Sequence, residues 1–148
     1  MAFHFTLEAV LRYWQSLEDQ ELLRLQTLLA RRGALLSEVE QLRKASLHLQ
    51  QETKRAMLLQ PTPAVEIQFA TARVNVLEHQ QQLLLRQLDE LQAAITEQRS
   101  RYQQQRRNRE VLESLRNQQW RDYQLTQRRR EQARLDELHL LRKKHVSP

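Results

Sequence analysis

The chain has 148 residues, including 28 Leu, 22 Gln and 20 Arg, but only one Gly, three Pro and no Cys. So few turn-forming residues exclude a sheet protein or a many-element α/β fold, and the composition favours long helices. The lack of cysteine excludes disulfides, thiolate metal sites and cysteine nucleophiles. Charge is uneven: residues 1–98 carry 10 basic and 12 acidic side chains, a net of −2, whereas residues 99–148 carry 14 and 6, a net of +8.

The first predicted element is a helix over about residues 6–59, after an extended start and with Thr6 as its cap. Apolar residues recur at alternating spacings of four and three, which is the pattern of a coiled-coil seam. The seam positions are Leu7, Leu11, Trp14, Glu18, Glu21, Leu25, Leu28, Arg32, Leu35, Val39, Leu42, Ser46, Leu49, Thr53 and Ala56. Trp14 is expected in the core, and Gly33 is interpreted as a tolerated weak spot or local bend.

The sequence Gln60-Pro61-Thr62-Pro63 predicts a turn over residues 60–63, with Thr62 as the next helix cap and Pro63 at the first helical position. A second helix is expected over about residues 64–143. Its seam reads Ile67, Ala70, Val74, Leu77, Gln81, Leu84, Leu88, Leu91 and Ile95. Between Gln98 and Glu110 the seam becomes polar, and we expect it to resume in a shifted frame at Val111, Leu112 and Leu115.

Two amphipathic helices joined by a short turn are expected to lie antiparallel, so that the numbers of facing residues add to about 124. This register places the acidic run Glu18–Glu21 opposite the arginine-rich stretch Arg99–Arg107. It also leaves the second helix without a partner for about 25 residues beyond Gln118. Because this overhang still carries Trp120, Tyr123 and several leucines, we expect it to bind another copy or another protein.

The sequence offers no chemistry typical of an enzyme. Two helices enclose no dry catalytic site, one glycine cannot build a phosphate-binding loop, and the five histidines lack the spacing of a helical zinc site. We therefore expect no catalytic activity, no cofactor and no metal. No apolar run is long enough to span a membrane, and the N-terminus lacks the pattern of a secretory signal, so we expect a cytoplasmic protein.

A second stripe lies one position off the seam of the second helix. Phe69, Arg73, Val76 and Gln80 follow one another at helical spacing. This stripe is interpreted either as a docking face for another protein or as a widened seam that tucks Phe69 against the first helix.

The two ends of the chain carry the pattern of a known family. The segment Phe3-His4-Phe5-Thr6-Leu7-Glu8-Ala9-Val10-Leu11-Arg12 resembles the N-terminus of the flagellar export protein FliJ family. The later segment from Glu110 to Arg116, together with Tyr123, Glu131-Gln132 and Asp136-Glu137, resembles the C-terminal pattern of that family. The similarity covers nearly the whole chain, including the proline-marked turn.

The resemblance implies a single elongated domain over residues 1–148, an antiparallel two-helix coiled coil similar to the γ subunit of rotary F-type ATPases. It implies a non-enzymatic stalk of the flagellar type III export apparatus, peripheral at the cytoplasmic face of the inner membrane. The implied partners are the hexameric export ATPase, the cytoplasmic domain of the export gate membrane protein, and export chaperones. The stripe at Phe69, Arg73, Val76 and Gln80 would face the gate. The implied ring-binding residues are Leu7, Leu11, Tyr123, Arg130, Glu131, Gln132, Asp136 and Glu137.

Three alternatives stay open at the level of sequence. The first is the equivalent stalk of a virulence-type injectisome, which shares the same pattern. The second is a generic coiled-coil scaffold that dimerises through its second helix. The third is nucleic-acid binding through the basic C-terminal third, although Glu131, Asp136 and Glu137 interrupt its positive charge.

Overall fold

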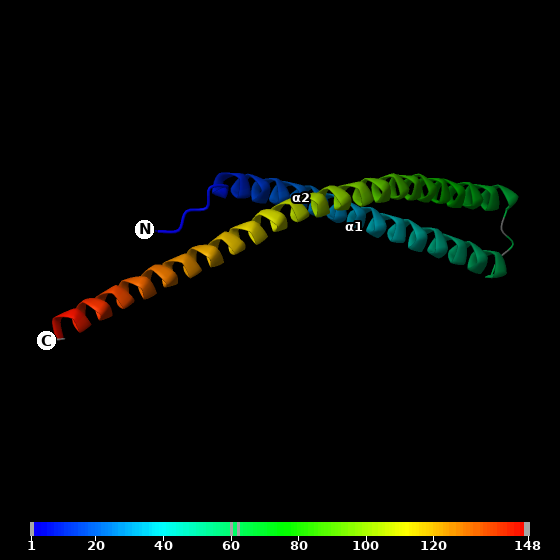
Figure 1. Ribbon diagram of the computed structural model, residues 1–148. Coiled ribbons are helices and arrows are strands. Elements are labelled where there is room, and N and C mark those ends of the chain that lie inside the picture. The colour runs from blue at the N-terminus through cyan, green and yellow to red at the C-terminus, as the bar shows by residue number, and fades with distance from the viewer. Residues whose placement is uncertain (1, 60, 62, 147–148) are drawn as a thin grey trace. The chain divides into compact units, whose positions relative to one another are not determined.

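The computed structural model describes residues 2–59, 61 and 63–146. This part of the chain consists of helix α1 (Glu8–Leu59) and helix α2 (Ala64–Val146), without a strand (Figure 1). The all-α prediction is confirmed, and the two helices pack against each other. The predicted cap Thr62 lies outside the described residues.

Backbone hydrogen bonds define where each helix begins. The carbonyl of Leu7 accepts the Leu11 amide at 2.9 Å, and the carbonyl of Pro63 accepts the Ile67 amide at 3.3 Å. Leu7 and Pro63 therefore each accept the first backbone hydrogen bond of the following helix while lying just before it. Pro63 precedes the first helical residue, whereas the prediction placed it at the first helical position. A proline suits this place because the position supplies only a carbonyl to the ladder.

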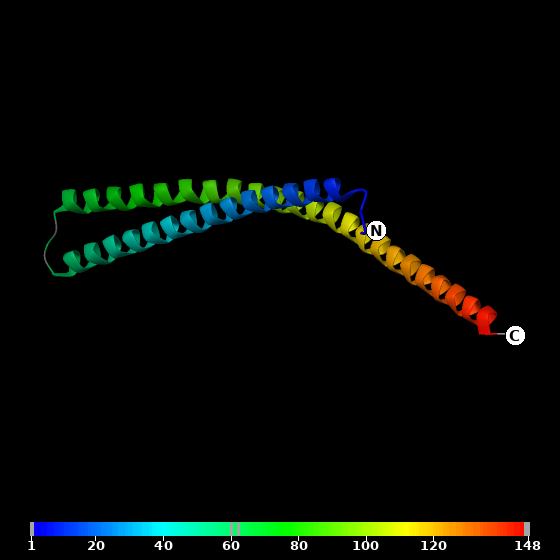
Figure 2. The same cartoon turned by 90° about the vertical axis from the view of Figure 1, so that its left-hand side faces the viewer.

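The chain divides into two compact units, and each contains a piece of both helices. One unit comprises Met1–Asp19 and Gln103–Pro148, and the other comprises Gln20–Tyr102. Figure 2 shows the same helices from a second direction, with the start of the chain in blue and the end of α2 in red.

The unit Gln20–Tyr102 is held by a small apolar cluster. Leu25, Leu91 and Ile95 are buried, and Tyr102 packs against them together with neighbouring leucines of α1. At about 25 cal/mol for each Å² of apolar surface removed from water, burial of such side chains is the main source of helix pairing. All three buried residues were predicted seam positions, and every predicted seam residue of α2 from Ile67 to Ile95 is at least partly buried.

Cross-helix hydrogen bonds confirm the predicted antiparallel register. In the unit Gln20–Tyr102, the Arg32 guanidinium donates to Gln92 at 3.3 Å, as expected for numbers that add to about 124. The Gln98 side-chain amide donates to the Glu21 carbonyl at 3.0 Å and also to the Glu21 carboxylate. In the other unit, Arg116 pairs with Glu8 at 3.5 Å.

The acidic run meets different partners from those predicted. Glu21 binds Gln98, and Glu18 forms an ion pair with Arg109, so the partners lie on either side of the predicted stretch Arg99–Arg107. Arg101 binds Glu97 and Arg106 binds Glu110 along α2 itself. The difference arises from the side of α2 on which each residue lies. Gln98 and Arg109 lie in the seam, whereas Arg101 and Arg106 face solvent.

The seam of α2 keeps one frame throughout, so the predicted shift is wrong. Val111 is 68% exposed and Leu115 is also exposed, whereas Leu112 is partly buried. Leu112 is reached from Ile95 by the same alternating steps of three and four residues. The positions between them are Gln98, Tyr102, Gln105 and Arg109, all buried or partly buried. The aliphatic stems of Gln98 and Arg109 fill the seam while their polar ends form hydrogen bonds with α1, whereas the buried side-chain oxygen of Gln105 has no hydrogen-bond partner among the described residues.

Arg109 is the best-connected charge of its unit. Besides Glu18, it binds Glu113 at 2.6 Å, and only 20% of its side chain and 12% of that of Glu18 are exposed. The hydrogen bond to Glu18 raises the pKa of Arg109, while burial acts in the opposite direction. The ion pair with Glu18 therefore favours the charged form of the guanidinium.

Replacing Arg109 by Gln should destabilise the protein by about 1–3 kcal/mol, because Glu18 would lose its partner in a largely buried position. Denaturant unfolding followed by circular dichroism measures the change. The matched control is Arg106→Gln, which removes an exposed ion pair and should cost less than about 0.5 kcal/mol. Equal losses for the two variants would show that burial of the Arg109 pair has no energetic consequence.

Gly33 lies inside α1 with ordinary helical backbone, and a Cβ added there would meet no atom within 4 Å. Gly33→Ala should therefore stabilise the protein by about 1 kcal/mol through helix propensity alone. The reciprocal control, Ala30→Gly on the exposed surface of the same helix, should destabilise by a similar amount. A loss of stability for Gly33→Ala in denaturant unfolding would contradict this account.

Candidate functional site

The stripe predicted as a docking face is exposed. Phe69 is 71% exposed and Val76 is 57% exposed. Together with Arg73 and Gln80 they line an open groove of about 300 Å³ whose other walls are Ala72 and Leu77. The structure therefore brings all four predicted residues onto one surface, and the alternative in which Phe69 is tucked against α1 is wrong.

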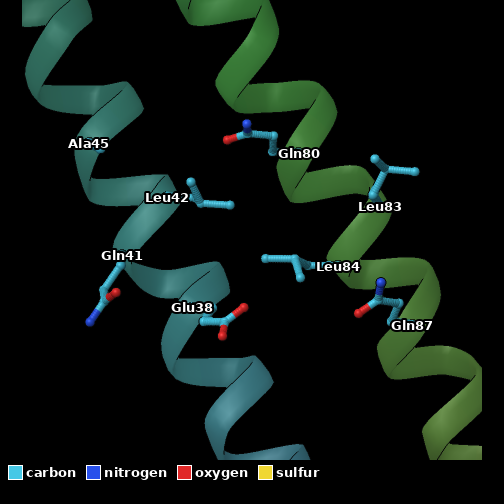
Figure 3. Close-up of a pocket in the computed structure, with 8 residues that line it drawn as sticks. All are labelled: Glu38, Gln41, Leu42, Ala45, Gln80, Leu83, Leu84 and Gln87. Atoms are coloured by element: carbon cyan, nitrogen blue, oxygen red, sulfur yellow. The ribbon is translucent and has the colours of Figure 1, made fainter.

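A larger groove continues from this stripe into the space between the two helices. It has a volume of about 550 Å³, and Gln80 lines both grooves. In Figure 3, Leu42 of α1 and Leu84 of α2 point toward each other across it. The remaining lining residues are Glu38, Gln41, Ala45, Leu83 and Gln87. The sequence pattern did not reveal the α1 side of this surface, because the rotation of α1 about its axis decides which residues border the groove.

The last part of α2 has no covering segment. Every residue from 128 to 145 is exposed, including Leu135, Leu138, Leu140 and Leu141. The implied ring-binding residues Arg130, Glu131, Gln132, Asp136 and Glu137 all lie here, and Gln132 donates a hydrogen bond to Asp136 at 3.1 Å. This exposed end of α2, residues 128–145, confirms that the helix continues past its partner.

The overhang begins later than predicted, because the N-terminal segment covers its first turns. The ring of Phe3 lies 5.1 Å from that of Trp120 and 5.5 Å from that of Tyr123, measured between ring centroids. Trp120 and Tyr123 stack on each other at 5.8 Å, and Phe5 is buried nearby in the chain. Trp120 and Tyr123 are therefore partners of the chain's own start, and we call this group the aromatic clamp.

Three of the implied ring-binding residues lie outside the exposed end of α2. Leu11 is 1% exposed, so its surface is covered by the packing of its own unit, whereas Leu7 is 36% exposed. Tyr123 is partly buried in the aromatic clamp.

The sequence contains a pattern that indicates the clamp. Phe3 and Phe5 alternate as in an extended segment, and Trp120 and Tyr123 share a helix face at i, i+3.

Other classes of site were searched for among the described residues. They contain no group of three acidic, histidine or cysteine side chains that could hold a metal ion. In the same residues, neither helix has a stretch apolar enough to cross a lipid bilayer.

Comparison of the chain with protein-family models, with curated proteins and with solved structures finds no match.

Phe3→Ala should open the aromatic clamp and increase the exposure of Trp120, which is 41% exposed in the intact protein. In a Trp14→Phe background, which leaves Trp120 as the single tryptophan, the emission maximum should shift to longer wavelength and acrylamide quenching should increase. The protein should also lose about 0.5–1.5 kcal/mol of stability. Phe69→Ala, which removes an exposed ring in the other unit, serves as the control. Unchanged emission after Phe3→Ala would show that the clamp does not form in solution.

Proposed function

We propose that this protein is a stalk-like component of the flagellar type III export apparatus, related in design to the γ subunit of rotary ATPases. In this role it binds the hexameric export ATPase through the exposed end of α2, binds the export gate through the stripe at Phe69, and assists export chaperones. It works as a binding protein at the cytoplasmic face of the inner membrane.

The observation that carries the proposal is the exposed end of α2. A helix that continues alone beyond its hairpin presents its whole circumference, which suits insertion into a closed ring of subunits. Residues 128–145 carry seven Arg and Lys against three Asp and Glu, so this end is positive and meets acidic surfaces favourably. A single helix with exposed leucines also gains from being covered by a partner.

The stripe at Phe69 supports a second contact away from the ring. It belongs to the unit Gln20–Tyr102, whereas the exposed end of α2 belongs to the other unit. Exposed aromatic and aliphatic side chains beside an arginine are typical of protein-binding surfaces. The two surfaces are therefore separate, and one molecule has distinct residues for each partner.

The proposed mechanism is differential binding. A ring of identical subunits passes through several nucleotide states, and a helix whose sides carry different charges binds some of these states more tightly than others. The protein would thus promote ring assembly and ATP turnover by its partner without performing chemistry itself. The protein can shift the populations of the nucleotide states only by the ratio of its affinities for those states.

Truncation after Gln127 tests the proposal. This variant removes the exposed end of α2 and keeps the aromatic clamp, so the paired helices should remain folded by circular dichroism. We expect stimulation of the purified cognate export ATPase to be lost, which ATP hydrolysis assays measure directly. Full stimulation by the truncated protein would refute ring binding through this end.

Phe69→Ala is the matched control for that assay. It alters the stripe in the other unit and should leave ATPase stimulation unchanged. Loss of stimulation in both variants, with helicity retained, would show that the ring does not bind the exposed end of α2 selectively.

A further inference from the structure

The stripe at Phe69 is part of a longer surface that faces outward from both helices. The groove at Phe69 shares Gln80 with the groove at Leu42, and that groove shares Gln87 with a third, which Arg31 and Ala94 line. Along α2 the surface follows the positions Phe69, Arg73, Val76, Gln80, Leu83 and Gln87, at spacings of four and three. That rhythm is a second coiled-coil seam, and we call the surface from Glu66 to Ala94, with its α1 border, the outer seam.

Four charged side chains of the outer seam lack an ionic partner among the described residues. Among the described residues, no ion pair is formed by Glu66 or Arg73 on α2 or by Arg31 or Glu38 on α1, whereas nearby Glu40 is bound by Arg43 at 2.7 Å. Glu38 borders the groove beside Gln87, and Arg31 borders the groove beside Ala94. Glu66, Arg73, Glu38 and Arg31 therefore alternate in sign along the surface, with Gln80 near its middle, and Glu90 lies in the same groove as Arg31.

We infer that the outer seam binds the outer seam of a second copy of this chain, antiparallel and with the two-fold axis near Gln80. This arrangement places Arg73 of each copy opposite Gln87 and Glu38 of the other. It places Glu66 opposite Ala94 and Arg31, so Glu66, Arg73, Glu38 and Arg31 each gain an opposite partner, while Glu90 lines the same groove as Arg31 of its own chain. Val76 meets the partner's Leu83 and Leu84 beside the axis. A two-fold contact requires such self-complementarity, because every contact between a residue of one copy and a residue of the other occurs a second time with the two copies exchanged.

The size of the surface fits a reversible dimer. From Glu66 to Ala94 the outer seam is about 40 Å long, and two neighbouring helices are about 20 Å wide, which gives about 800 Å² for each copy. This area reaches that of standard protein interfaces. The apolar content is modest, since Phe69, Val76 and Leu83 alternate with polar residues, so we expect a dimer that forms at micromolar concentration.

This inference goes beyond the proposed function and does not require it. The same stripe would bind either a second copy or the export gate, so self-association would compete with gate binding. The dimer is measured with the purified chain alone, so its failure is distinguishable from a failure of ATPase stimulation.

Sedimentation equilibrium over about 5–300 µM tests the inference through charge reversal. Arg73→Glu should weaken the dimer at least tenfold, because the introduced carboxylate would face the carboxylate of Glu38 twice in each dimer. Glu38→Arg should weaken it similarly. The double variant, Arg73→Glu with Glu38→Arg, should return the dissociation constant to within about threefold of the original. Arg86→Glu, an exposed reversal on another face of α2, is the control and should have no effect.

Three results would overturn the inference. The first is a monomer over the whole concentration range. The second is a dimer that the single reversals weaken but the double variant does not restore. The third is a dimer that is insensitive to Arg73→Glu and is lost on truncation after Gln127, which would locate self-association in the exposed end of α2. Circular dichroism of each variant confirms that the helices are intact.

Discussion

The pairing of α1 with α2 depends on a rhythm of positions more than on the amount of apolar surface. Only Phe5, Leu11, Leu25, Leu91 and Ile95 are buried hydrophobic residues among those the structure describes. The remaining seam positions are partly covered, and several are polar. Because the spacing of four and three is never broken, each partly covered side chain still meets the other helix, and many small contributions add up.

The polar part of the seam gives the hairpin its register. A seam of leucines alone could slide by one heptad and bury nearly the same area. Glu18 with Arg109, and Glu21 with Gln98, are largely buried pairs that any such slide would separate. Separation would leave the Glu18 carboxylate without its partner in a poorly hydrated place, at a cost of about 1–3 kcal/mol. Specificity and stability are thus supplied by different sections of the same seam.

The sequence predicts the parts of this structure that periodicity controls. The helix bounds, to within a few residues, and the antiparallel register follow from spacing and from the two prolines, whereas spacing left two interpretations of the stripe at Phe69 open. Spacing could not identify Arg109 as the partner of Glu18, because the seam was expected to lose its frame between Gln98 and Glu110. The aromatic clamp was missed for a related reason: Phe3 lies in a segment without helical periodicity, and its docking depends on tertiary contact. The α1 border of the outer seam likewise depends on helix rotation.

The aromatic clamp also constrains how the chain folds during synthesis. Phe3 precedes Trp120 by 117 residues, so it leaves the ribosome well before Trp120 and Tyr123 are synthesised. Until then α1 has no complete partner, and its leucines are open to aggregation or to chaperone capture. Pairing can start beside the prolines and proceed away from them along both helices, so the clamp closes last. Phe3 therefore stays without its aromatic partners while more than a hundred further residues are added to the chain.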